Sequence, residues 1–412
     1  MNGDAIREQI QALCELPHRG STTEEERRAA EIIAERLRKV GLEVEQERFY
    51  SHTTWSWVYV ILFAGFVLAS FLSAGSPFLA FLLSLLLLFF NYAEHTTRFE
   101  GLGQFLPKRP SQNVVARRHA PQARAHVVVS CHLDTSRSGL AFSPALVKHF
   151  RSSFIFSLIV QGGLALVFLI RTFGGDGFLL DAFQVLATVF LAYGIVLMVD
   201  REWRGQYVNG ANDNASGVAA MMALASRFSA DPPDSLDLWF LANGCEEVGM
   251  VGQRHFLLNH AHELPADRTF FLNLDNVGAG RLRYCTGEGM IKFFPYSPTL
   301  VHLARQAART EPFRDVTPHA YTRAYFDALV PAARGYEALT LIALDEEDQI
   351  PNWHWPTDTI ENVDVAIVKK AADFAEEILR RLDREVAPLP DRGAPAVSRN
   401  AGAGKVLSGD KR

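Results

Sequence analysis

Residues 208–217 read Val-Asn-Gly-Ala-Asn-Asp-Asn-Ala-Ser-Gly and open into a run of small residues at helical spacing, residues 215–228. A carboxylate where a loop meets a helix can project into a cleft and not along a helix face, so Asp213 is a candidate site residue. This stretch alone leaves another interpretation open, because Asp213 or Asn214 can simply cap the helix. Four other stretches of the chain bear on the choice.

The composition limits the possible functions. A chain of 412 residues can form one large domain with additions or two domains. The net charge of −5 gives no reason to expect nucleic acid as a partner. Four cysteines stand apart with no Cys-x-x-Cys pair, which predicts reduced thiols and no disulfide framework. Residues 1–9 are polar and charged, so no cleavable signal peptide is expected.

Four long runs lack charged residues. Residues 49–93 contain no Asp, Glu, Lys or Arg, and they hold an apolar run at 55–73 and a shorter one at 77–92. Two more runs follow at 152–170 and 182–199. A buried core is the alternative, but a core rarely needs four runs of this length. We therefore predict four transmembrane helices, inserted as two hairpins at residues 54–93 and 152–199, with the lipid bilayer as a partner.

The rest of the chain alternates strands with helices. Strands are expected at residues 113–116, 125–130, 236–241, 270–274, 282–285 and 339–344, and helices at 215–228, 252–259, 299–309 and 363–384. This alternation predicts an α/β fold with a doubly wound, mainly parallel sheet. The domain would comprise residues 1–50, 94–150 and 205–386. The tail at 387–412 is rich in Pro, Gly, Ala and Ser and is predicted to be disordered.

Polar residues follow the predicted strands, where the sites of such sheets form. The strand at 125–130 leads to His132-Leu-Asp134, where His132 can bind a metal while Asp134 accepts a hydrogen bond from a ligand's other ring nitrogen. The strand at 236–241 leads to Glu246 and Glu247, which would repel each other unless a cation or a shared proton relieves them.

Two further stretches extend this pattern. Asp275 follows the strand at 270–274, and His354 and Asp358 lie in a loop before the last helix. Each alone has an ordinary explanation as a strand end, a cap or a loop histidine. Together they place two histidines and several carboxylates at separate strand ends and loops, which predicts a shared site. His18 and Arg19 have no such partners nearby, and we interpret them as structural.

These motifs resemble the M28 family of zinc peptidases. The resemblance is carried by His132-Leu-Asp134, the Gly-Ala-Asn-Asp-Asn-Ala-Ser-Gly stretch at 210–217, Glu246-Glu247-Val-Gly, Asp275, and His354 before Asp358-Thr359. It extends over residues 6–382, with both hairpins as insertions. A doubly wound zinc-peptidase fold is what the resemblance implies.

The resemblance also implies the metal ligands. They would hold two Zn²⁺, with Co²⁺ or Mn²⁺ as alternatives for such ligands. His132 and Asp275 would bind one ion, Glu247 and His354 the other, and Asp213 both. The family often has a cis peptide bond after the bridging aspartate.

The remaining roles follow from the same resemblance. Glu246 would be the general base, and Asp134 would orient His132. Two tryptophans flank His354, where some relatives have a tyrosine that helps catalysis, so Tyr321, Tyr325 and Tyr336 stay open as candidates for that donor.

The expected function is therefore hydrolysis of a peptide substrate by a membrane-bound metallopeptidase, most simply an aminopeptidase. A catalytically inactive receptor or scaffold, a glutaminyl-cyclase-like activity and a carboxypeptidase are the alternatives. A transporter is disfavoured because the predicted spans carry no ionisable residue. Basic residues flank the hairpins on the domain side, so the positive-inside rule predicts an integral, multi-pass protein whose catalytic domain is cytoplasmic. The oligomeric state and the side-chain preference are open.

Overall fold

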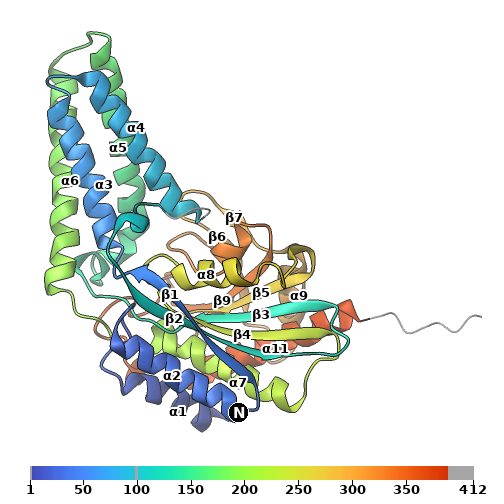
Figure 1. The fold of residues 1–412 in the computed structure, drawn as a ribbon. Helices are drawn as coiled ribbons and strands as arrows, with labels where there is room; N and C mark the ends of the chain where they lie inside the picture. The colour runs from blue at the N-terminus through green and yellow to red at the C-terminus, as the bar shows by residue number, and fades with distance from the viewer. Residues whose placement is uncertain (1, 98–100, 388–412) are drawn as a thin grey trace, which may run out of the picture.

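The computed structural model describes residues 2–97 and 101–387, and these form a nine-stranded sheet domain from which a bundle of helices projects (Figure 1). Two short helices pack on one face of the sheet, α8 (Val251–His260) and α10 (Leu329–Ala332). The other face is covered by α1 (Gly3–Cys14), α2 (Glu24–Lys39), α7 (Gly217–Ala230), α9 (Pro298–Ala307) and α11 (Val365–Val386). The predicted disordered tail lies outside the described residues, apart from Ala387.

The sheet has the order β1-β2-β4-β3-β5-β9-β6-β7, with β8 beside β6. Its strands are β1 (Glu43–His52), β2 (Lys108–Arg118), β3 (Ala125–His132), β4 (Leu236–Asn243), β5 (Thr269–Leu274), β6 (Arg281–Glu288), β7 (Phe294–Pro295), β8 (Thr317–Tyr321) and β9 (Glu337–Leu344). The centre of the sheet, β4-β3-β5-β9, is parallel, and β8 also pairs parallel with β6.

The prediction of a mainly parallel sheet is therefore wrong at the edges. Strand β2 pairs antiparallel with both β1 and β4, and β6 pairs antiparallel with β9. Parallel neighbours need a long crossover connection, usually a helix, whereas antiparallel ones do not. Strands β5 and β6 follow each other in the chain and are joined by a short link without a helix, so β6 runs antiparallel to the central strands. The helix–strand alternation that predicted parallel strands does not extend to this part of the chain.

Helix α7 fills the space behind the central strands. Its small residues let it lie close to the sheet, and nearly every residue from Gly217 to Ala225 is fully buried. Helix α1 was not predicted. It packs on α7 through Ile6, Ile10 and Leu13, which are buried. The carboxyl ends of β3, β4 and β5 consequently open on one side of a rigid core.

Four helices form the bundle: α3 (Ser56–Leu72), α4 (Pro77–Thr96), α5 (Phe150–Thr172) and α6 (Phe178–Arg204). Three segments are long and apolar enough to cross a membrane, Pro77–Thr96, Val147–Thr172 and Phe178–Arg204. Helix α3 has 17 residues and is shorter than these, so three of the four predicted spans are candidates by length and composition. Helix α4 continues beyond the predicted apolar run at 77–92 through Glu94 and His95.

The bundle has its own apolar core and an apolar outer surface. Its inner cluster includes Leu62 and Phe66 of α3, Leu164 and Phe168 of α5, and Leu191 of α6. Large apolar side chains also lie exposed along the outside of all four helices. Such an extended apolar surface is rare on a monomeric soluble protein and marks a surface that contacts a partner or a membrane.

Candidate active site

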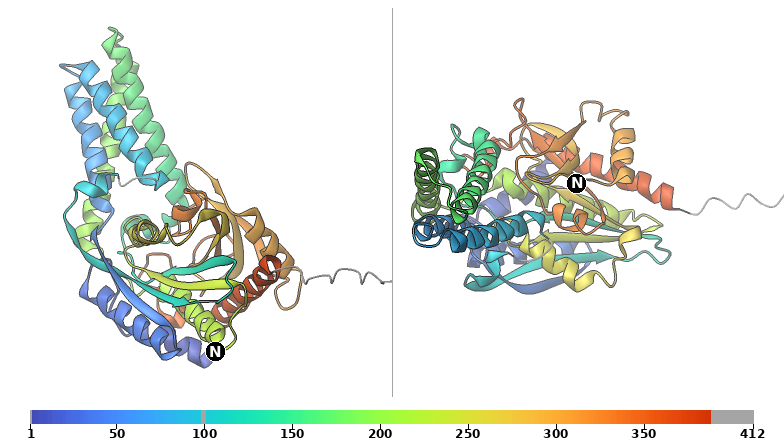
Figure 2. Two further views of the ribbon diagram at one scale, coloured as in Figure 1. Left: turned by 45° about the vertical axis from the view of Figure 1, so that its right-hand side comes forward. Right: turned by 90° about the horizontal axis from the view of Figure 1, so that it is seen from above.

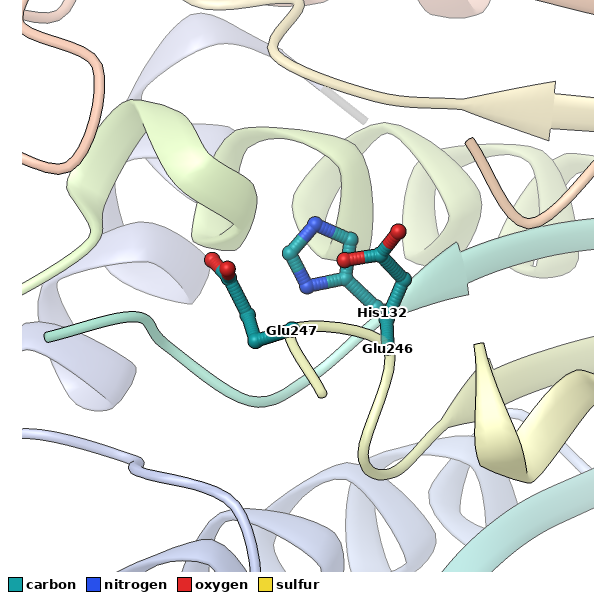
Figure 3. Close-up of side chains that lie close together, drawn as sticks. All are labelled: His132, Glu246 and Glu247. Carbon is teal, nitrogen blue, oxygen red and sulfur yellow. The ribbon is translucent and has the colours of Figure 1, made fainter. Parts of the chain in front are cut away.

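Five predicted ligands come together at the carboxyl ends of the central strands. His132 ends β3, Asp275 follows β5, Glu247 lies in the loop after β4, Asp213 precedes α7, and His354 comes from the loop before α11. All five side chains are buried. Figure 3 shows His132 with both glutamates of the β4 loop, and the three side chains converge from the two neighbouring strand ends.

Asp213 stands between the two histidines. Its Oδ1 lies 3.1 Å from Nε2 of His132, and its Oδ2 lies 3.3 Å from Nε2 of His354. On the outer sides, His132 Nε2 is 3.6 Å from Asp275 Oδ1, and His354 Nε2 is 3.1 Å from Glu247 Oε2. The carboxylate of Asp213 therefore belongs to two ligand groups at once, one on each oxygen.

The dimensions of both groups fit zinc. Two ligand atoms at 2.0–2.1 Å from a tetrahedral zinc ion are about 3.3 Å apart, close to the distances observed here. The ligand atoms of His132, Asp213 and Asp275 lie within 4.8 Å of one another, and so do those of Asp213, Glu247 and His354. Oε1 of Glu247 is buried with no hydrogen-bond partner among the described residues. A cation would satisfy it.

A third group of the same kind joins His132 with Glu246 and Glu247. The geometry alone thus allows Glu246 to be a ligand, and the distinction between Glu246 as base and Glu247 as ligand comes from the family resemblance. Glu246 differs from Glu247 in its surroundings. It is partly exposed and borders the cavity described below, whereas Glu247 is buried beside His354.

The charges of the site are strongly coupled. Burial raises the pKa of Glu246 well above its usual value, and the neighbouring carboxylates of Asp327 and Glu247 raise it further. Burial lowers the pKa of His354, but Glu247 and Asp213 more than offset this and raise it to about 9. Such perturbed values mark functional sites.

Asp134 contacts both His132 and the β4 loop. Nδ1 of His132 lies 3.1 Å from the main-chain carbonyl oxygen of Asp134 and 3.6 Å from its carboxylate, so the carbonyl is the nearer acceptor. The carboxylate accepts hydrogen bonds from the main-chain N–H groups of Glu246 and Glu247, at 3.0 and 3.2 Å, and from the hydroxyl of Ser21 at 2.6 Å. It holds the β4 loop in place.

Asp358 fixes the main chain beside Asp213. Its carboxylate accepts hydrogen bonds from the N–H groups of Asn212 and Asp213, at 2.6 and 3.0 Å. The Asp213–Asn214 peptide bond is cis, as the resemblance implied. The side chain of Asn214 donates to the carbonyl of Leu274 and accepts from the N–H of Asn276. The loops that carry Asp213 and Asp275 are thus tied together.

Two supporting residues escaped the sequence analysis or were only partly understood. Glu26 of α2 is buried and accepts hydrogen bonds from the N–H of Cys245 and from Ser111, so it braces the β4 loop from behind. Arg19 is buried and donates to the carbonyls of Leu133, Asn209 and Gly210, which agrees with the structural role expected for it.

A cavity of about 450 Å³ adjoins the ligand groups. It is bordered by all five ligand residues and Glu246 at one end and is mostly apolar elsewhere, with aromatic residues such as Phe142 and Trp353 beside His354. Of the three tyrosines that the sequence left open, Tyr325 lines this cavity, and its hydroxyl has no hydrogen-bond partner among the described side chains. Pockets of this size and character take ligands.

The histidines and carboxylates gathered at the ends of the parallel strands form an arrangement that could hold metal ions. The comparisons with known proteins specify the class further. Residues 193–379 match the model described as Peptidase family M28. The matched range contains every predicted ligand except His132. The resemblance seen in the sequence is therefore confirmed over these residues, and the matches support a metal-dependent peptidase.

Relatives agree with this classification. The chain is 30% identical over 174 residues to Aminopeptidase YwaD of Bacillus subtilis, covering 40% of this chain and 36% of that protein. It is 27% identical over 192 residues to a vacuolar membrane protease of Clavispora lusitaniae, covering 43% and 17%. The matched part thus spans about a third of the first relative's length and a sixth of the second's.

A solved structure shows the fold. The zinc aminopeptidase BSAP of Bacillus subtilis superposes with a TM-score of 0.55 at 16% identity, over 92% of this chain and 95% of the other. The fold of the zinc peptidases is therefore present in this chain.

Proposed function

We propose that this chain is a membrane-associated metallopeptidase that binds two zinc ions and releases the N-terminal residue of a peptide. The observation that carries the proposal is Asp213, whose two oxygens each face one histidine, and each histidine also faces a further carboxylate. His132 and Asp275 would hold one ion, and Glu247 and His354 the other. When bound, two such ions polarise a carbonyl and lower the pKa of water.

The side chains around the ions would supply the proton transfer. Glu246 borders the cavity, and burial raises its pKa, which makes its carboxylate a stronger proton acceptor than a free one. It would accept a proton from the attacking water and donate it to the leaving amine. Asp134 would hold the main chain of Glu246 and Glu247 in place through the two hydrogen bonds that its carboxylate accepts.

The hydroxyl of Tyr325 is our candidate for the donor that stabilises the developing oxyanion, because it is the one of the three tyrosines that borders the cavity. The end of the cavity that the ligand residues and Glu246 border is acidic, which suits the ammonium group of a free N-terminus. Two proteins that this chain resembles, Aminopeptidase YwaD and the zinc aminopeptidase BSAP, favour the same activity.

One substrate comparison tests the exopeptidase proposal. A short peptide with a free amine and its N-acetylated counterpart are offered to the purified full chain in detergent. We expect acetylation to remove most of the activity, because a site arranged for a charged amine loses its partner. Equal cleavage of both peptides would point to an endopeptidase or a carboxypeptidase, and cleavage of neither would favour an inactive receptor or scaffold.

Membrane association is the second part of the proposal. It is supported by three helices long and apolar enough to span a bilayer and by the similarity to a vacuolar membrane protease. We place the sheet domain on the cytoplasmic side, since basic residues flank the bundle there. An impermeant thiol reagent should label a cysteine introduced at Asp176, between α5 and α6, in intact cells, and should not label one introduced at Leu258, which is exposed on α8. The reverse pattern would invert the orientation.

A further inference from the structure

The cavity at the ligand groups does not belong to the sheet domain alone. One end is formed by the ligand residues, and the other end is formed by the bundle. The bundle residues on its wall come from all four helices, and they include Tyr59 and Phe63 of α3, Glu94 and His95 of α4, Phe154 of α5, and Phe190 and Leu197 of α6. Figure 2 shows the bundle rising from one edge of the sheet domain.

The bundle is attached to the site by a buried arginine. Arg201, near the end of α6, donates hydrogen bonds to Ser56 at the start of α3 and to Ser136 in the loop after His132. Its guanidinium also lies over the ring of Trp55 at 4.5 Å. The helices that form the apolar wall are therefore held in register with the strand end that carries His132.

The mouth of the cavity lies on the bundle side. Three of its lining residues are also exposed: Leu146 (46%), Ser153 and Tyr193 (57%). They lie at the start of α5 and along α6, and Phe156 of α5 meets Phe190 of α6 just beyond them, with ring centroids 5.1 Å apart. The opening is thus between α5 and α6, on the domain side of that aromatic contact.

The mouth lies at the level of the apolar part of α6. Tyr193 precedes Asp200, the first charged residue after the apolar run, by seven residues, which corresponds to roughly 10 Å along a helix. A bilayer that covers the apolar run would therefore cover the Tyr193 side of the mouth, since its hydrocarbon core is about 30 Å thick. Leu146 lies before Lys148 and Arg151, on the domain side of the charge-free run. A molecule can therefore reach the α6 side of the mouth from lipid.

We propose that the substrate is a polypeptide with an apolar N-terminal segment, which enters the cavity from the bilayer between α5 and α6. This inference rests on the proposed peptidase function and on the membrane placement of the bundle. The cavity has the complementary chemistry along its length. Carboxylates at the closed end attract the terminal ammonium, and the apolar wall of the bundle takes the side chains that follow it.

The first test blocks the mouth. The full chain is placed in lipid nanodiscs with Tyr193→Cys or the matched control Val196→Cys, and each is treated with a bulky maleimide. Val196 is 60% exposed on the same helix and does not line the cavity. Wild type treated in the same way accounts for the native cysteines, of which Cys131, Cys245 and Cys285 are buried.

Two substrates are compared in this test. They share their first four residues, and one of them continues into a membrane-inserted apolar helix. Modification at Tyr193 should lower cleavage of the inserted peptide at least tenfold relative to the short soluble one, and modification at Val196 should change neither by more than twofold. Equal effects on both peptides, or no effect at Tyr193, would overturn entry from the bilayer. If untreated wild type cleaves neither substrate, the proposed function itself fails.

The second test measures the apolar preference. Leu197→Gln places an amide on the cavity wall, and Val196→Gln places one on the outer surface of the same helix. We expect the ratio of kcat/KM for peptides with leucine after the first residue to that for peptides with serine there to fall about tenfold in the first variant and to stay within twofold in the second. Unchanged ratios in both would mean that the wall is filled by lipid and does not contact the substrate.

Discussion

Replacing Asp134 by asparagine separates the two roles that this residue can play. The carbonyl that faces His132 belongs to the main chain and survives the substitution. The carboxylate does not. It accepts two main-chain hydrogen bonds, from Glu246 and Glu247, and one from Ser21, all in a fully buried position. An amide offers one oxygen in place of two, so at least one of these two N–H groups loses its acceptor.

The size of the effect follows from that count. A buried donor left without an acceptor costs about 1–3 kcal/mol, so we take about 2 kcal/mol for Asp134→Asn. If this cost falls on the reactive arrangement of the β4 loop, it corresponds to a rate loss of about 30-fold. That value lies within the 10- to 100-fold range typical of residues that orient metal ligands.

The assay has three readouts on one preparation: urea unfolding, bound metal and kcat. We expect lower stability, a reduced kcat and loss of metal mainly from the Glu247 and His354 group, with the His132 group retained. Ser21→Ala is the matched control, since it removes one donor and leaves the carboxylate, and it should cost about 1 kcal/mol or less. Near-normal values for Asp134→Asn on all three readouts would refute this account of the β4 loop.

Three other expectations concern single residues. Glu246→Gln should keep the bound metal and lower kcat by about 10²- to 10⁴-fold, whereas Glu247→Gln should also lose metal. If both variants keep full metal and turnover, the roles of Glu246 as base and Glu247 as ligand are wrong. Arg19→Met should lower the free energy of unfolding in urea by about 3 kcal/mol, because three buried carbonyls lose their donor. A change under 0.5 kcal/mol, roughly the size of a surface substitution, would contradict this. Burial raises the pKa of Glu288 from 4.5 to about 8, so its contribution to stability is present below pH 4.5 and is lost as the pH rises through 8. Glu288→Gln should therefore gain Tm relative to wild type between pH 5 and pH 8.5, and a constant difference would show that Glu288 does not titrate there.

The central strands could be predicted because they are short apolar runs followed by polar residues, and parallel strands place those residues together. The edges could not. The first residues of β2, Lys108 and Arg109, carry charge and no apolar alternation, and they form a strand only because β1 is there to pair with them. Ile6, Ile10 and Leu13 stand at helical spacing and are the sequence signal for α1, which the predicted helices do not include.

In the site, too, some features could be predicted from the sequence and others could not. Residue types and their positions after strands predicted which side chains meet, but not which atom of Asp134 faces His132, because carbonyl and carboxylate of one residue are equivalent in a sequence. Glu26 lies 219 residues from Cys245, and no local pattern connects them. The docking of the bundle on the site was equally hidden, since the apolar runs show that the helices form but not where they pack.

The most direct test of the central claim is a metal titration of the purified, metal-stripped chain with zinc, in which bound ions and peptide hydrolysis are measured together. The account predicts no hydrolysis without metal, recovery on adding zinc, and saturation at two ions per chain, with an Asp213→Ala variant that binds fewer than two and stays inactive. Full hydrolysis by the metal-free chain, or two ions still bound in Asp213→Ala, would contradict it.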